Sequence, residues 1–86
     1  MKDREVQFEI KKQICTLNPG APDAWTLELN IVAWNGGAPK WDIRHWNDDH
    51  TRMGRGLTFT DDEMSALVGA YYDTSDDEDI QELLNK

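Results

Sequence analysis

Two tryptophans and a group of cations lie close together in the middle of this 86-residue chain. Trp34 and Trp46 occur in one stretch with four basic residues, Lys40, Arg44, Arg52 and Arg55. Indole rings stack on unpaired nucleic-acid bases, and ammonium or guanidinium groups bind the phosphates that link those bases. The pattern therefore predicts a surface for single-stranded DNA or RNA, in which the tryptophans stack on bases and the cations contact phosphates.

Two lysines nearer the start of the chain, Lys11 and Lys12, are further candidates for the path of the phosphate backbone. Binding to single strands weakens with salt by a log–log slope of roughly −0.7 per phosphate neutralised, so several such contacts are measurable. Each cation taken singly is also explained as a solvated surface residue. The same aromatic surface would suit a protein partner, so a protein–protein interaction module is the alternative function.

Asp48, Asp49 and His50, with His45 nearby, are the residues best suited to acid–base or metal chemistry. Their spacing matches no ligand motif, and a hydrophilic loop accounts for them equally well. We predict no catalytic residue, no metal and no cofactor, and keep a small hydrolase using Asp49 and His50 as a third alternative. Because Cys15 is the one cysteine, no intramolecular disulfide can form, and we expect a small core or sheet residue there.

Alternating apolar residues predict the strands that position these side chains. Val6, Phe8 and Ile10 alternate with polar residues, which is the period of a half-buried strand, and the pattern blurs after Lys12 as it would at a bulge. The second strand, over residues 25–34, has an apolar face formed by Trp25, Leu27, Leu29, Ile31 and Ala33. We expect this face to point into the core.

The third strand, after Pro39, alternates in the same way, with Trp41 and Ile43 on its apolar side. If that side faces the core, the opposite side carries the candidate binding residues outward: Trp34, Lys40, Arg44 and Trp46. An exposed aromatic pair on a solvated face usually marks a binding surface. The alternative is that both rings fold against a bulge, a dimer interface or the loop after Asn47.

Local signals predict the connections and the C-terminal helix. Asn35-Gly36-Gly37 favours a tight hairpin turn, and residues 47–56 are expected to form a loop before a short strand at 57–59. Thr60 and Glu63 have the spacing of a capping box. The helix that follows has an apolar stripe, which is core or a dimer seam: Met64, Leu67, Val68, Tyr71 and Tyr72. The order β-β-β-β-α predicts an α+β domain over residues 1–72.

The formal net charge of −8 comes from the end of the chain. Residues 1–60 contain eight basic and eight acidic residues, whereas residues 61–86 contain nine acidic residues and only Lys86. A neutral domain with an acidic extension is compatible with a nucleic-acid partner. Residues 73–86 are expected to form an acidic tail, or a short helix begun by a second capping box at Ser75 and Glu78. A further hypothesis is that the carboxylates of this tail compete with phosphates for the cationic surface.

A chain of 86 residues forms one small domain with a limited core, so pairing with a second copy would add buried area. The first residues, Met1 to Glu5, lack the apolar run of a signal peptide, and no stretch of about 18 apolar residues occurs. The sequence predicts a soluble protein of the reducing cytoplasm, without a membrane partner.

Two longer motifs resemble a known family. Pro39-Lys-Trp-Asp-Ile-Arg-His-Trp46 and Asp49-His-Thr-Arg-Met-Gly-Arg-Gly-Leu-Thr-Phe59, followed by an acidic helix start, are similar to the bacterial YdbC-like branch of the positive-cofactor-four transcriptional coactivators. The resemblance covers about residues 5–72. The chain departs from the family in its acidic extension after Tyr72 and in the Gly-Gly-Ala of its hairpin.

This resemblance implies a curved four-stranded antiparallel sheet followed by a helix. It also implies a homodimer that cradles single-stranded DNA with little sequence preference, in transcription or DNA maintenance. By position, Arg44 and Trp46 match the family's cation and aromatic residue on the third strand, and Trp34 matches an aromatic residue at the hairpin. Arg52 and Arg55 match the basic loop.

Overall fold

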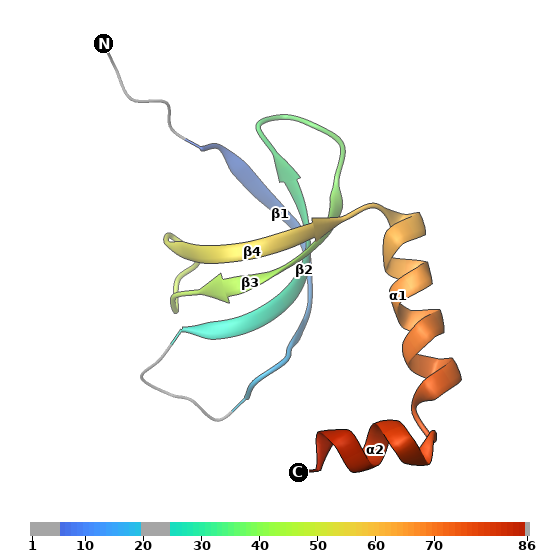
Figure 1. Cartoon of the computed structure of the whole chain (residues 1–86). Helices are drawn as coiled ribbons and strands as arrows, with labels where there is room; N and C mark the ends of the chain where they lie inside the picture. Colours follow the sequence, from blue (N-terminus) through green and yellow to red (C-terminus); the bar gives the residue numbers. More distant parts are fainter. Residues whose placement is uncertain (1–5, 20–24, 86) are drawn as a thin grey trace.

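A computed structural model of the chain describes residues 6–19 and 25–85 (Figure 1). The start of the predicted domain and the connection at residues 20–24 lie outside the described residues. The elements follow the chain as β1 (Phe8–Thr16), β2 (Thr26–Trp34), β3 (Lys40–Trp46), β4 (Met53–Phe59), α1 (Asp61–Thr74) and α2 (Glu78–Leu84). Each strand pairs antiparallel with the next, in the order β1-β2-β3-β4. The predicted fold class, a four-stranded antiparallel sheet followed by a C-terminal helix, is confirmed.

The first connections follow the local signals. β1 carries two register shifts against β2, between Ile10 and Lys12 and between Gln13 and Cys15, which explains why its alternation blurs. Asn35 and Gly36 both adopt positive φ, at 51° and 77°, and the Gly37 N–H donates to the Trp34 carbonyl at 2.8 Å. The predicted tight turn is therefore present.

β4 is longer than predicted, because it begins at Met53 inside the stretch expected to be a loop. A side chain at Gly56 would collide with the Cβ of Arg44 and the carbonyl of Ile43 on β3. Glycine therefore lets β4 approach β3 closely, although the Met-Gly-Arg-Gly sequence lacks the branched side chains that usually mark a strand. Arg55 lies in this strand and not in a basic loop.

The sheet is rolled. Phe8 pairs with Trp34 at one end of β2, and Trp46 pairs with Thr26 at the other end, eight residues away. In a flat sheet these positions would be about 26 Å apart, at roughly 3.3 Å per residue. The Phe8 and Trp46 ring centroids are nevertheless 5.1 Å apart, so the sheet curls toward the face that both rings share.

We call this concave side the inner face; it carries Phe8, Glu28, Asn30, Val32, Trp34, Asp42, Arg44 and Trp46. The outer face carries Trp25, Leu27, Leu29, Ile31, Trp41, Ile43, His45, Leu57 and Phe59. The largest fully buried side chains, Trp46, Val32, Asn30 and Asp42, all belong to the inner face. On the outer face Trp25 is 41% exposed and Leu57 is 64% exposed. The face predicted to be the core is therefore the less buried one: Ala33 is buried, but Leu27, Leu29 and Ile31 are only half-buried, because rolling encloses the opposite face.

α1 touches the sheet only through its first turns. The capping box is formed as predicted: the Glu63 N–H donates to Thr60 Oγ1, and the Thr60 N–H donates to Glu63 Oε1. Met64 is buried, and the Trp41 indole N–H donates to Asp61 at 3.0 Å. Beyond these residues α1 runs away from the sheet (Figure 1), so most of its apolar stripe does not pack as core.

The acidic extension is helical where the structure describes it. α1 continues past Tyr72 to Thr74, and α2 begins at Glu78 with Asp77 as its N-cap. The Asp77 carboxylate accepts from the N–H groups of Asp79 and Ile80, so the capping box predicted at Ser75 is wrong. Neither helix, over the residues described, is long and apolar enough to cross a membrane.

Candidate nucleic-acid interface

Trp46 has no exposed surface in the chain. Its ring lies 5.1 Å from that of Phe8 and 5.5 Å from that of His50, both tilted against it. The prediction that Trp46 projects into solvent is wrong, because the roll of the sheet brings β1 across it. One of the alternatives raised by the sequence, packing against the loop after Asn47, describes its contact with His50.

Trp34 is half-buried on the same inner face. The Arg44 guanidinium carbon lies 4.6 Å from the Trp34 ring centroid, and the Phe8 ring lies 6.0 Å away. The sequence therefore placed both tryptophans and Arg44 on one face correctly, but Trp46 is enclosed, and Arg44 and Phe8 lie against Trp34. Within the described residues the buried indole N–H groups of Trp34 and Trp46 have no hydrogen-bond partner.

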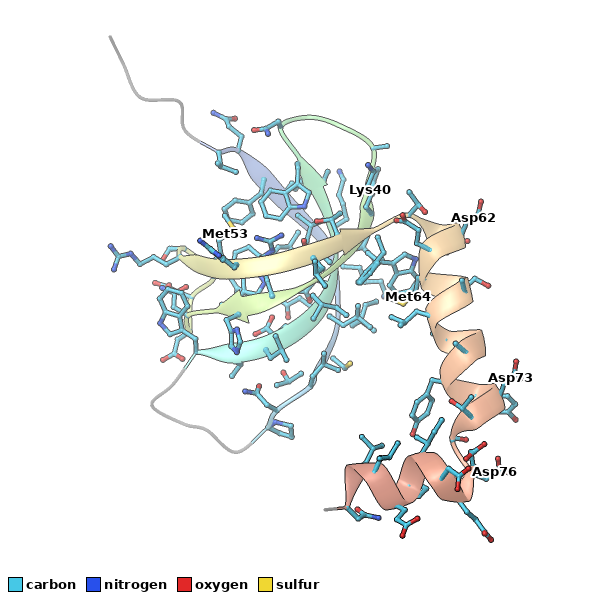
Figure 2. The ribbon with its side chains drawn as sticks, viewed as in Figure 1. Lys40, Met53, Asp62, Met64, Asp73 and Asp76 are labelled. Atoms are coloured by element: carbon cyan, nitrogen blue, oxygen red, sulfur yellow. The ribbon has the colours of Figure 1, made fainter. Side chains whose placement is uncertain are left out.

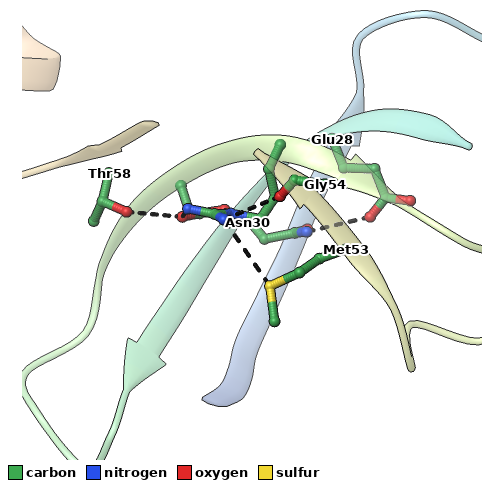
Figure 3. A network of polar contacts seen from close by, with 7 residues as sticks. Glu28, Asn30, Met53, Gly54 and Thr58 are labelled. Carbon is green, nitrogen blue, oxygen red and sulfur yellow. Dashed lines mark hydrogen bonds and ion pairs between the residues drawn. The ribbon is translucent and has the colours of Figure 1, made fainter. Parts of the chain in front are cut away.

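Arg44 is held by a buried carboxylate. Its Nε and Nη2 donate to the two oxygens of Asp42 at 2.7 and 2.9 Å, and Nη1 donates to the Gly54 carbonyl at 3.3 Å. Asp42 is fully buried and also accepts from the Thr58 hydroxyl at 2.9 Å; Figure 3 shows this network. A bidentate pair of this kind neutralises Arg44 and fixes its direction. Arg44 therefore builds the inner face and is not a free phosphate ligand.

A second polar group surrounds Glu28. Its carboxylate accepts from Thr26 at 2.6 Å and Asn30 at 3.2 Å, and lies 2.8 Å from His50 Nε2. Burial of the carboxyl opposes its ionisation, but hydrogen bonds from Thr26, His50 and Asn30 outweigh that effect and lower the pKa of Glu28 below its ordinary value. Glu28 and Asp42 were not among the residues predicted from the sequence, although acidic residues on otherwise hydrophobic strands were the available signal.

Asp49 and His50, the pair considered for catalysis, are engaged in different contacts. The Asp49 carboxylate accepts from the Thr51 hydroxyl at 2.7 Å, whereas His50 turns to Glu28 through a backbone with φ of 59°. No group of three or more His, Cys, Asp or Glu side chains within residues 6–19 and 25–85 is arranged to hold a metal. Cys15 is an exposed strand residue beside a shallow pocket of about 220 Å³.

The remaining candidate cations are distributed over both faces. Lys40 pairs with Val32 and so shares the inner face, whereas Lys12 pairs with Ile31 and shares the outer face. Lys11 forms an exposed pair with Glu9 at 3.2 Å. Four exposed cations have no carboxylate within ion-pair distance in the described part of the chain: Lys12, Lys40, Arg52 and Arg55.

Comparison with known proteins gives one informative relative. No family model matches the chain. A protein of Treponema pallidum (strain Nichols), described as an uncharacterized protein, is 38% identical over 63 residues. The match covers 73% of this chain and 73% of the Treponema protein, so it extends over most of both.

Proposed function

Because this chain belongs to one family with the Treponema pallidum protein, whose description assigns no activity, we propose its function from its own residues. It is a homodimer that binds single-stranded nucleic acid, with DNA as the first expectation, without sequence preference. The observation that carries the proposal is the set of exposed cations without carboxylate partners in the described chain, Lys12, Lys40, Arg52 and Arg55. Such cations are available to phosphates, whereas Arg44 is not.

The distribution of negative charge supports this placement. We call α1, α2 and the turn between them the helical arm. Asp73 and Asp76 lie on this arm, on the opposite side of the molecule in Figure 2 from Met53 at the start of β4. Phosphates approaching Arg52 and Arg55, which flank Met53, therefore avoid the most acidic part of the described chain. Lys40 begins β3, at the opposite end of that strand from Trp46, which pairs with Met53, and Lys11 and Lys12 lie on β1, so these lysines are separate candidates for phosphate contact. The net charge of −8 does not oppose local phosphate binding.

The homodimer is supported by the apolar surface that one copy leaves uncovered. Leu57 on the outer face and Leu67, Val68, Tyr71 and Tyr72 on α1 are all more than 45% exposed. The radius of gyration is 15.8 Å, against about 12 Å expected for a compact domain of this length. A second copy that covers α1 and the part of the outer face around Leu57 would bury these side chains.

The resemblance to the YdbC-like branch of positive-cofactor-four coactivators is part of the same proposal, including a role in transcription or DNA maintenance. It adds support from the motifs around Arg44 and Gly56. Two of its assignments change: Trp46 and Arg44 become residues that shape the sheet, and the phosphate contacts fall to the exposed cations.

The test is a fluorescence-anisotropy titration of labelled oligo-dT at several salt concentrations. We expect binding that weakens with salt, with similar affinity for other unpaired homopolymers and weaker binding to duplex DNA, whose bases are already stacked. The triple variant Lys40→Ala, Arg52→Ala, Arg55→Ala should have a log–log salt slope less steep by roughly 0.7 for each lost phosphate contact. Absence of salt-dependent binding by the wild-type protein would refute the proposal.

The alternative function, a protein–protein interaction module, is favoured by the uncovered stripe on α1. Its binding would depend on apolar contact and would not need to weaken steeply with salt. The same titration series therefore separates the two functions.

A further inference from the structure

Trp25 is the most exposed of the four tryptophans. It is 41% exposed, whereas Trp34 and Trp41 are half-buried and Trp46 is fully buried. Trp41 also has its indole N–H bound to Asp61. Trp25 belongs to the apolar face that the sequence predicted to be core. A large indole exposed on that face usually marks a binding surface.

Trp25 directly precedes β2, and its six-membered ring lies close to Gly54 on β4, two strands away. A Cβ placed on Gly54 would lie 3.8 Å from Cζ3 of Trp25, 3.9 Å from its Cε3 and 3.6 Å from the Cβ of His45. The edge of the indole therefore lies close to the backbone of Gly54, on the side of β4 that also faces His45. One part of the ring rests on the protein and another part remains open to solvent.

Two exposed arginines lie next to Gly54 in the sequence or at the same end of the sheet. Arg55 follows Gly54 directly, so its Cα is about 3.8 Å from that of the glycine under the ring. Arg52 lies one residue before β4 at the same end of the sheet, and both arginines are exposed without a carboxylate partner in the described residues. Asp49 in the adjoining loop is already hydrogen-bonded to Thr51. An exposed ring beside two guanidinium groups fits a base and its neighbouring phosphates.

This end of the sheet also stays clear of the surface assigned to the dimer. α1 meets β3 at Trp41, and His45 is four residues further along, about 13 Å away. A second copy that covers α1 and Leu57 would therefore leave the end of the sheet at Trp25 accessible.

From this arrangement we propose that Trp25, and not Trp34 or Trp46, is the side chain on which a base of the single strand stacks, with Arg55 and Arg52 binding the flanking phosphates. This inference rests on the proposed function and gives it a specific site. The proposed binding is non-covalent, so no covalent bond is made or broken. Stacking on an indole is sequence-tolerant, because every base has an aromatic face.

The test uses the full-length chain, labelled with ¹⁵N at the tryptophan indoles and titrated with oligo-dT. We expect the Trp25 indole N–H signal to shift most, with a much smaller shift at the buried Trp46. Trp25→Ala should weaken oligo-dT binding about 5- to 150-fold, the equivalent of 1–3 kcal/mol per stacked base at 1.4 kcal/mol per tenfold change.

Three variants separate stacking from simple apolar contact and from damage to the fold. Trp25→Phe should retain most of the affinity, because it keeps a ring, whereas Trp25→Leu should bind as weakly as Trp25→Ala. Ile14→Ala is the matched control, since Ile14 is 40% exposed in β1 and outside the site. Circular dichroism should give the same spectrum for all of these variants.

The outcomes are distinct. If Trp25→Leu and Trp25→Ala bind oligo-dT as tightly as the wild type, the stacking site is wrong and the proposed function stands. If the wild-type protein shows no salt-dependent binding at all, both proposals are wrong.

Discussion

The two faces of the sheet differ in a way that their polarity does not suggest. The inner face carries two carboxylates, an arginine and an asparagine, and it is nevertheless the buried face. The outer face is almost entirely apolar and remains half-exposed. The curvature of the sheet, and not the polarity of its faces, therefore determines which face is enclosed in a single copy. Polar groups can then occupy the enclosed side if they satisfy one another, as Asp42 and Arg44 do.

The largest loss of stability is expected when the buried carboxylate of the inner face, Asp42, is removed. Asp42→Ala would leave the Arg44 guanidinium, whose side chain is 14% exposed, without its bidentate partner. Breaking a buried pair costs about 3–5 kcal/mol of unfolding free energy. Urea denaturation should report a loss of this size. The control is Asp76→Ala, an exposed carboxylate, and an equal effect of the two variants would contradict the role of the inner face.

A negative charge introduced on the outer face should weaken self-association without unfolding the chain. We expect Leu57→Asp to weaken self-association at least tenfold, because a desolvated carboxylate opposes burial by a second copy. Analytical ultracentrifugation should show the mass falling toward that of one 9.9 kDa chain, with an unchanged circular dichroism spectrum. Lys40→Asp, which changes charge on the inner side, should leave the mass unaltered. A wild-type protein that is already monomeric would remove the dimer from the proposal.

Two glycines, Gly56 in β4 and Gly69 in α1, should respond differently to replacement by alanine. Gly56→Ala should destabilise the chain by about 1–3 kcal/mol, because the new methyl group meets Arg44 and the carbonyl of Ile43. Gly69→Ala on α1 meets nothing within 4 Å and should stabilise the helix by up to about 1 kcal/mol. Thermal unfolding of the two variants should therefore shift in opposite directions. Shifts in the same direction would show that β4 does not pack against β3 as described.

The smallest expected effect is a pH dependence from Glu28. Its pKa is lowered in the folded chain from 4.5, so its contribution to stability is present above about pH 4.5 and is lost as the pH falls through the lower folded value. Glu28→Gln should flatten the acid side of the stability profile. Asp49→Asn is the comparison, because hydrogen bonds from Thr51 also lower the pKa of this exposed carboxyl. Solvent screening should make its effect smaller.

Local patterns in the sequence were enough for much of the fold. Alternation identified β2 and β3, Asn35-Gly36 identified the turn, and the Thr60–Glu63 spacing identified the start of α1. These features depend on residues a few positions apart, so they can be recognised without tertiary information.

The candidate site was harder to predict, because it depends on contacts between distant residues. Alternation shows that Trp34 and Trp46 share a face, but it does not show the direction in which the sheet rolls. The pairing of Arg44 with Asp42 two residues earlier could be guessed from spacing, whereas the 5.1 Å contact of Phe8 with Trp46 could not. The exposure of Trp25 follows from the same curvature.

The bulges of β1 have a consequence for how copies of this chain can meet. β1 and β4 are the two edges of an open sheet, and their unpaired backbone groups would be templates for a strand of another molecule. Two register shifts interrupt β1, and β4 contains two glycines, so neither edge offers a long regular ladder. Growth by continuous strand addition is thereby discouraged, and the proposed homodimer would have to form through the apolar surface, as a closed pair.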